Sequence, residues 1–114
     1  MNTLFHNGKN KRELEQAVII HFNYGMEDSD PFYELVSKLR DEIELRKVGD
    51  YDGHEMAMDN SDGFFYMYGP SAEVLFKSIK PILEATNFMK GATALLRFGP
   101  PGEGAQVIEV TIGS

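Results

Sequence analysis

The stretch Ala17–Tyr24, with the sequence AVIIHFNY, predicts a β-strand from which the rest of the fold can be built. Residues in a strand point alternately to its two faces. One face of this strand carries Val18, Ile20, Phe22 and Tyr24. The other face carries Ala17, Ile19, His21 and Asn23. The first set is wholly apolar, apart from one phenol, and we expect it to face the core.

A helix is expected after this strand. Asp30 suits its N-cap, Pro31 its first position and Gly49 its end. Between them, apolar residues recur at helical spacing and form one buried stripe. This stripe contains Phe32, Leu35, Val36, Leu39 and Ile43.

Four more strands and a second helix follow. The strands are Glu55–Asp59, Phe64–Tyr68, Thr93–Phe98 and Gln106–Ile112, and the first two are joined by a turn over residues 60–63. Ser71 suits the N-cap of the second helix. Its expected buried stripe is Val74, Leu75, Ile79, Ile82 and Leu83. Pro81 lies within that stripe, so we expect a kink or a break near residues 77–80.

The order of elements, β-α-β-β-α-β-β, predicts an α+β domain with ferredoxin-like topology. Such a domain has an antiparallel sheet with both helices on one face, which leaves the other face open. We expect residues 17–114 to form this single domain, and residues 1–16 to be a polar, flexible segment. By alternation, the open face should carry His21, Asn23, Glu55, Tyr66, Tyr68, Arg97, Glu109 and Thr111.

The negative charge is concentrated in one part of the chain. The 114 residues carry a net charge of −7, and the stretch 26–62 alone holds twelve acidic and four basic residues. An acidic chain without a basic stripe repels a phosphate backbone, so we expect no binding to nucleic acid. The acidic stretch is either a solubilising surface or a docking surface for a basic protein.

Several classes of protein are disfavoured by composition. The chain has no cysteine, which excludes disulfides, thiolate metal sites and a cysteine nucleophile. No apolar run approaches the ~18 residues of a membrane span, and the polar start does not resemble a secretory signal. We therefore expect no membrane association and a cytoplasmic location.

Three short stretches carry a family resemblance. They are Val48–Glu55 (VGDYDGHE), Phe65–Pro70 (FYMYGP) and Ala72–Phe76 (AEVLF). The chain resembles a group of small bacterial proteins with the pattern G-x-(F/Y)-D-G-(H/N)-E … Y-G-P-x-A-(D/E)-x-L-F, over about Ala17 to Ile112. This resemblance implies the fold and a bacterial origin. It carries over no established activity.

Metal binding is poorly supported by the sequence. Asp50, Asp52 and Gly53 suggest a calcium loop, but in the calcium template Val48 would occupy an acidic position and Asp59 the place of a bidentate glutamate. His54 and Glu55 are adjacent on a strand and point to opposite sides, so they cannot both join His21 at one metal. We expect no metal or other cofactor.

No catalytic motif stands out either. Glu55, Glu109, His21 and Arg97 could share the open face, although ion pairing across strands explains such a set equally well. Ser71 is an expected N-cap, and the loop Gly99–Gly104 lacks the lysine and the following helix of a phosphate-binding loop. We expect no enzymatic activity.

The sequence favours a protein-binding module, of the type of an immunity protein or antitoxin that neutralises a basic toxin. The residues expected to bind the partner are Asp50, Asp52, His54, Glu55, Asp59, Asp62, Tyr66 and Tyr68. The alternative is a ligand-binding or self-associating domain, a homodimer that buries Ile19, Tyr66 and Tyr68 across a two-fold axis.

Overall fold

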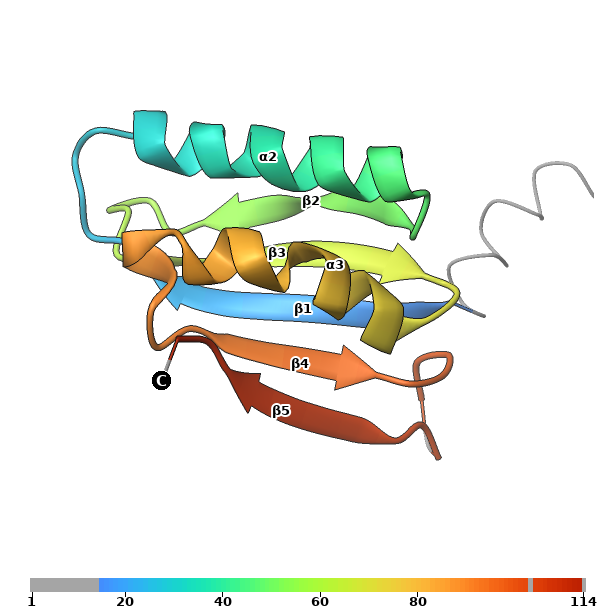
Figure 1. The fold of residues 1–114 in the computed structure, drawn as a ribbon. Coiled ribbons are helices and arrows are strands. Elements are labelled where there is room, and N and C mark those ends of the chain that lie inside the picture. Colours follow the sequence, from blue (N-terminus) through green and yellow to red (C-terminus); the bar gives the residue numbers. More distant parts are fainter. Residues whose placement is uncertain (1–14, 103, 114) are drawn as a thin grey trace, which may run out of the picture.

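The computed structural model describes residues 15–102 and 104–113. The described elements, in chain order, are β1 (Gln16–Asn23), α2 (Asp30–Arg46), β2 (Asp50–Met56), β3 (Asp62–Gly69), α3 (Ala72–Glu84), the short 3-10 helix η1 (Asn87–Met89), β4 (Thr93–Arg97) and β5 (Val107–Thr111) (Figure 1). Most of the segment 1–16, predicted to be flexible, lies outside the described residues. Its last residue, Gln16, already belongs to β1.

The fold has the predicted ferredoxin-like α+β architecture. The strands form one sheet in the order β2-β3-β1-β4-β5, and every neighbouring pair is antiparallel. Both helices lie on the same face of this sheet (Figure 1). β5 extends the sheet beyond β4 and forms its second edge. Within the described part of the chain, neither helix is long and apolar enough to cross a membrane.

The core lies between the helices and the sheet, and a group of stacked aromatic rings occupies its centre. The ring of Phe22 on β1 stacks on Phe65 of β3 with a centroid distance of 4.7 Å. Phe32 of α2 stacks on both, at 5.9 Å from Phe22 and 5.6 Å from Phe65. Such ring pairs each contribute about 0.5–1.5 kcal/mol beyond the burial of their area. These rings join α2 to the two strands at the middle of the sheet.

The predicted stripe of the first helix is confirmed, because all five of its apolar residues are buried in α2. The predicted ends of this helix are wrong by one residue at the start and two at the end. Ser29 is at the N-cap position and Asp30 is already helical, while Lys47, with a left-handed φ of 54°, ends the helix in place of Gly49.

Gly49 has a different role, at the close approach of β2 and β3. A Cβ atom on Gly49 would lie 2.1 Å from the backbone oxygen of Tyr68, and one on Gly69 would lie 2.3 Å from the backbone oxygen of Val48. Real Cβ atoms do not approach backbone oxygens this closely. The two strands can therefore meet here only because both positions lack side chains.

The largest difference from the sequence prediction concerns β2. The stretch Asp50–Glu55, predicted as a loop leading into a strand, is itself most of this strand, and residues 57–61 form the turn that follows. A β-bulge lies between Tyr51 and Gly53, where the register with β3 shifts. The bulge breaks the alternation of the strand, and aspartate and glycine are rare in strands, so the sequence pattern gave no strand signal here.

The second helix, α3, is capped as predicted and is not broken near residues 77–80. The Ser71 hydroxyl accepts a hydrogen bond from the Val74 amide at 3.2 Å. The helix runs through Pro81 to Glu84, so the expected break is wrong. The predicted stripe also needs correction. Val74 is half exposed, and Phe76 is buried beside Leu75, Ile79 and Leu83.

The close approach of β2 and β3 leads to a test. Replacing Gly49 by alanine should lower the free energy of unfolding by at least about 2 kcal/mol, because the new Cβ atom must displace the backbone of Tyr68. Urea unfolding measures this change. The matched control is Gly99→Ala, whose Cβ atom would have its nearest neighbour at 3.7 Å. Equal stability of the two variants would contradict this account.

Candidate functional site

The face of the sheet opposite the helices is the candidate site. The strand registers place Ile19 opposite Tyr66 and Leu95, and His21 opposite Phe64 and Thr93. They confirm the predicted direction of all eight polar and aromatic residues assigned to this face. These residues are His21, Asn23, Glu55, Tyr66, Tyr68, Arg97, Glu109 and Thr111.

The middle of this open face is partly apolar. Ile19, Phe64 and Leu95 are each partly exposed there. Together with His21, Thr93 and Glu109 they line a shallow hollow of about 310 Å³. The Phe64 ring lies 4.7 Å from the His21 ring and 6.1 Å from the Tyr66 ring, measured between centroids. A strip of rings therefore runs over β3 and β1 on this face.

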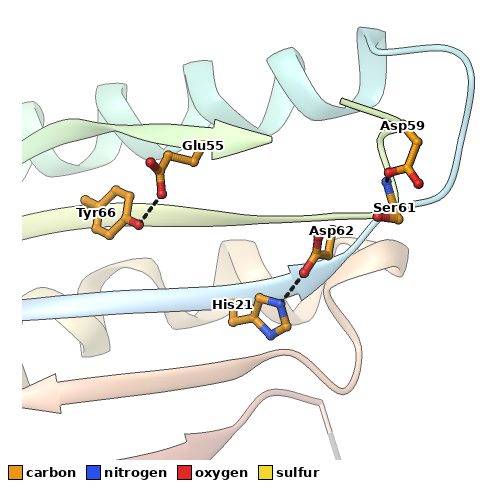
Figure 2. Close-up of polar contacts among 6 residues, drawn as sticks. All are labelled: His21, Glu55, Asp59, Ser61, Asp62 and Tyr66. Carbon is orange, nitrogen blue, oxygen red and sulfur yellow. Dashed lines mark hydrogen bonds and ion pairs between the residues drawn. The ribbon is translucent and has the colours of Figure 1, made fainter. Parts of the chain in front are cut away.

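The two end rings of this strip, His21 and Tyr66, each form a polar pair (Figure 2). The His21 Nε2 atom lies 2.7 Å from the Asp62 Oδ2 atom. The Tyr66 hydroxyl donates a hydrogen bond of 2.6 Å to the Glu55 Oε1 atom. This bond, together with partial burial and the negative charge of Glu55, raises the pKa of Tyr66 to about 12. Tyr66 therefore remains a neutral hydrogen-bond donor at physiological pH.

At one end of the sandwich the β1–α2 loop lies beside the β2–β3 turn (Figure 1), and both segments are rich in acidic residues. Three hydrogen bonds join these segments. The Tyr24 amide donates to the Ser61 oxygen at 2.9 Å, the Gly25 amide to the Asn60 oxygen at 2.6 Å, and the Asn60 side-chain amide to the Met26 oxygen at 3.2 Å. We call this region the acidic end. Its carboxylates belong to Glu27, Asp28, Asp30, Asp59 and Asp62.

The tip of the acidic end combines charge with an apolar side chain. Met58 is fully exposed in the β2–β3 turn, next to Asp59. The Ser61 amide donates a hydrogen bond of 3.0 Å to the Asp59 Oδ1 atom (Figure 2). Hydrogen bonds from Ser61 lower the pKa of Asp59, so this carboxylate stays ionised. Met58 thus places one exposed apolar side chain beside these charges.

His54 lies on the other face of β2, away from the open face. Its ring packs edge-on against Phe32 at 4.8 Å, and its Nδ1 atom lies 2.7 Å from the Tyr51 hydroxyl. The Arg40 guanidinium lies 5.0 Å from the centre of the Tyr51 ring. Burial, followed by the charge of Arg40, lowers the pKa of His54, and burial raises the pKa of Tyr51. His54 is thus a neutral, structural residue under α2.

The structure separates the eight predicted partner-binding residues into groups. Asp50, Glu55, Asp62, Tyr66 and Tyr68 belong to the open face, and Asp52 is exposed at the bulge. Asp59 lies at the acidic end, whereas His54 lies under α2 and cannot share a surface with the others. The prediction missed Phe64, Leu95 and Met58. Alternation from Tyr66 and Arg97 could have placed the first two on the open face.

The geometry gives metal ions little to bind. In residues 15–102 and 104–113, no three His, Asp or Glu side chains are grouped so that they could hold a metal ion. The failed calcium template is explained by β2: Asp50 and Asp52 lie in an extended strand rather than in a chelating loop. His21 and Glu55 share the open face, and His54 does not.

No family model, curated protein or solved structure matches this chain in comparisons with known proteins. The resemblance to small bacterial proteins stays a prediction.

The Tyr66–Glu55 pair predicts an alkaline titration. Glu55→Gln removes the negative charge that receives the Tyr66 proton, so the pKa of Tyr66 should fall from about 12 toward its ordinary value of 10.0. Because the folded chain holds this proton more tightly than the unfolded chain, the associated stabilisation is complete below pH 10 and disappears as the pH rises toward 12. The phenolate absorbance, compared with that of Tyr66→Phe, isolates this group. A pKa unchanged by Glu55→Gln would refute the assigned cause.

The neutral His54 predicts a second titration, now in acid. Its pKa should lie below the ordinary 6.5, and Arg40→Gln should raise it part of the way back. Because the folded-state pKa is depressed, the stabilisation is complete above pH 6.5 and is lost as the pH falls below it. Imidazole chemical shifts measure both values. Arg46→Gln, a charge removal at the exposed end of α2, serves as the control and should leave His54 unchanged.

Proposed function

We propose that this chain is a non-enzymatic protein-binding module that docks a basic protein on its acidic end and on the adjoining part of the open face. The observation that carries the proposal is the meeting of two acidic segments, one of which carries the fully exposed Met58. The β1–α2 loop and the first residue of α2 supply three carboxylates, and the β2–β3 turn and the first residue of β3 supply two. A surface of one sign with an apolar residue at its tip suits recognition of a cationic partner.

The negative charge of this surface speeds its association with a basic partner and makes binding selective. Opposite charge on a partner raises the association rate by about 10–10³-fold at low salt, while a like-charged protein is repelled. The carboxylate of Asp59 is held ionised by its hydrogen bonds to Ser61, so the charge of the tip persists under mildly acidic conditions.

The apolar and aromatic residues would slow the dissociation of the bound partner. Methionine and tyrosine are enriched in interface centres, where they lose water on binding. Met58 at the tip and the Phe64–Tyr66 strip on the open face lie on either side of Asp62 along the chain. A partner that covers both would place its basic groups against Asp62 and Glu55 at the rim.

The type of partner follows from this chemistry. A small acidic protein that covers a basic surface can block the nucleic-acid site of a cationic nuclease, and immunity proteins and antitoxins of toxin systems act in this way. We therefore propose a basic toxin as the partner class, in line with the expectation from the sequence.

The test uses tagged full-length chain to capture proteins from an extract of its own cells, followed by binding kinetics with the purified captured protein. The double variant Glu27→Gln/Asp59→Asn should slow association by about tenfold at low salt, and Met58→Ser should speed dissociation. The matched control, Glu73→Gln/Glu84→Gln, removes the same charge from exposed positions on α3.

The outcomes separate clearly. A basic captured protein, whose association slows with salt and with the acidic-end variant but not with the control, supports the proposal. Equal effects of the two double variants, or a captured partner that is itself acidic, would show that the acidic end is only a solubilising surface.

A further inference from the structure

The outer edge of β5 is a second surface at which the chain could bind another β-strand. In the described part of the chain, β5 pairs with β4 alone and forms one edge of the sheet (Figure 1). Its register with β4 is continuous over five residue pairs, from Thr93–Thr111 to Arg97–Val107. A regular, unprotected edge of this kind can accept another strand.

Backbone hydrogen bonds show which groups of β5 point outward. The Ile112 amide donates to the Ala92 oxygen, and the Phe98 amide donates to the Gln106 oxygen, each at 2.8 Å. Residues 106 and 112 therefore direct their backbone groups toward β4. Because these groups alternate along a strand, Val107, Glu109 and Thr111 direct theirs toward the outer edge.

The side chains of β5 favour pairing with another strand. Val107 is 46% exposed and Ile108 is 43% exposed, although both are β-branched and apolar. Glu109 is the single charged residue of the strand. Proteins usually protect an edge with charges, bulges or prolines, and β5 has only this one charge.

The opposite edge of the sheet is protected. β2 carries Asp50, Asp52 and Glu55, and its bulge between Tyr51 and Gly53 interrupts the regular ladder. The strand order separates the two edges by four strand spacings of about 4.8 Å each, or about 19 Å. That distance exceeds the screening length of about 8 Å at physiological salt. Two copies joined at β5 therefore keep their acidic segments apart.

We propose that two copies of this chain pair through β5, antiparallel about a two-fold axis at Ile108, so that their sheets become continuous. In this register Ile108 faces Ile108 of the second copy, and Val107 faces Glu109. The arrangement keeps the two Glu109 carboxylates from lying directly opposite each other, a position that destabilises a strand pair. It leaves both acidic ends free, so the dimer goes beyond the proposed function and presents two docking sites.

Sedimentation velocity of the full chain tests the pairing. Wild-type chain should be dimeric at about 100 µM, and Ile108→Lys should raise the dissociation constant at least about tenfold, because two ammonium groups would meet at the axis. Leu45→Lys alters a 75% exposed residue of α2 and is the control, which should remain dimeric. An equimolar mixture of Ile108→Lys and Ile108→Glu chains should restore the dimer, which a merely unfolded variant could not do.

Amide hydrogen exchange gives an independent readout on the unmodified chain. The amides of Val107 and Glu109 should exchange slowly at high concentration and rapidly on dilution, since they are bonded only in the dimer. A wild-type monomer at about 100 µM overturns the proposal. So does a dimer whose β5 amides stay fast, and which is disrupted by Phe64→Lys on the open face. Neither result bears on capture of a basic protein, so the two proposals fail separately.

Discussion

The contact of three phenylalanine rings at the centre of the core is the constraint on which the rest of this structure depends. Phe22, Phe32 and Phe65 come from β1, α2 and β3, and each lies within 5.9 Å of the other two. Their position fixes which face of β1 and β3 is covered by helices. Side chains alternate along a strand, so the residues on the uncovered face are also determined. They are Ile19, His21, Phe64 and Tyr66. The candidate surface is thus a direct consequence of core packing.

Much of this architecture is predictable from the sequence, because long alternating and helical patterns carry it. The faces of β1 and the buried stripe of α2 follow from spacing alone. β2 does not, since its stability comes from pairing with β3 rather than from its own composition. The ends of α2 also differ, because a lysine at position 47 adopts the left-handed conformation that the sequence favours at a glycine. At this point the close approach of β2 and β3, which requires Gly49, outweighs the preference for a glycine at the helix end.

The candidate site was only partly predictable for a related reason. A count along the chain identifies the acidic stretch, but only the folded chain shows that the β1–α2 loop and the β2–β3 turn lie together through Gly25, Met26 and Asn60. The full exposure of Met58 likewise depends on the end of β2 at Met56, which the sequence placed three residues later. His54 shows the reverse case. Its polar neighbours in the sequence suggest a binding role, while its ring packs on Phe32 under a helix.

The bulge in β2 has a consequence for how the chain could vary in length. Asp52 and Gly53 together oppose the single residue Tyr66, so β2 contains one residue more than β3 at this point. Tyr51 before the bulge and His54 after it both face the helices, although two residues lie between them and a regular strand would turn them to opposite faces. A homologue lacking one of these two residues could therefore keep every other side chain of β2 on its present face. An alignment would show that gap inside a strand, where gaps are normally least expected.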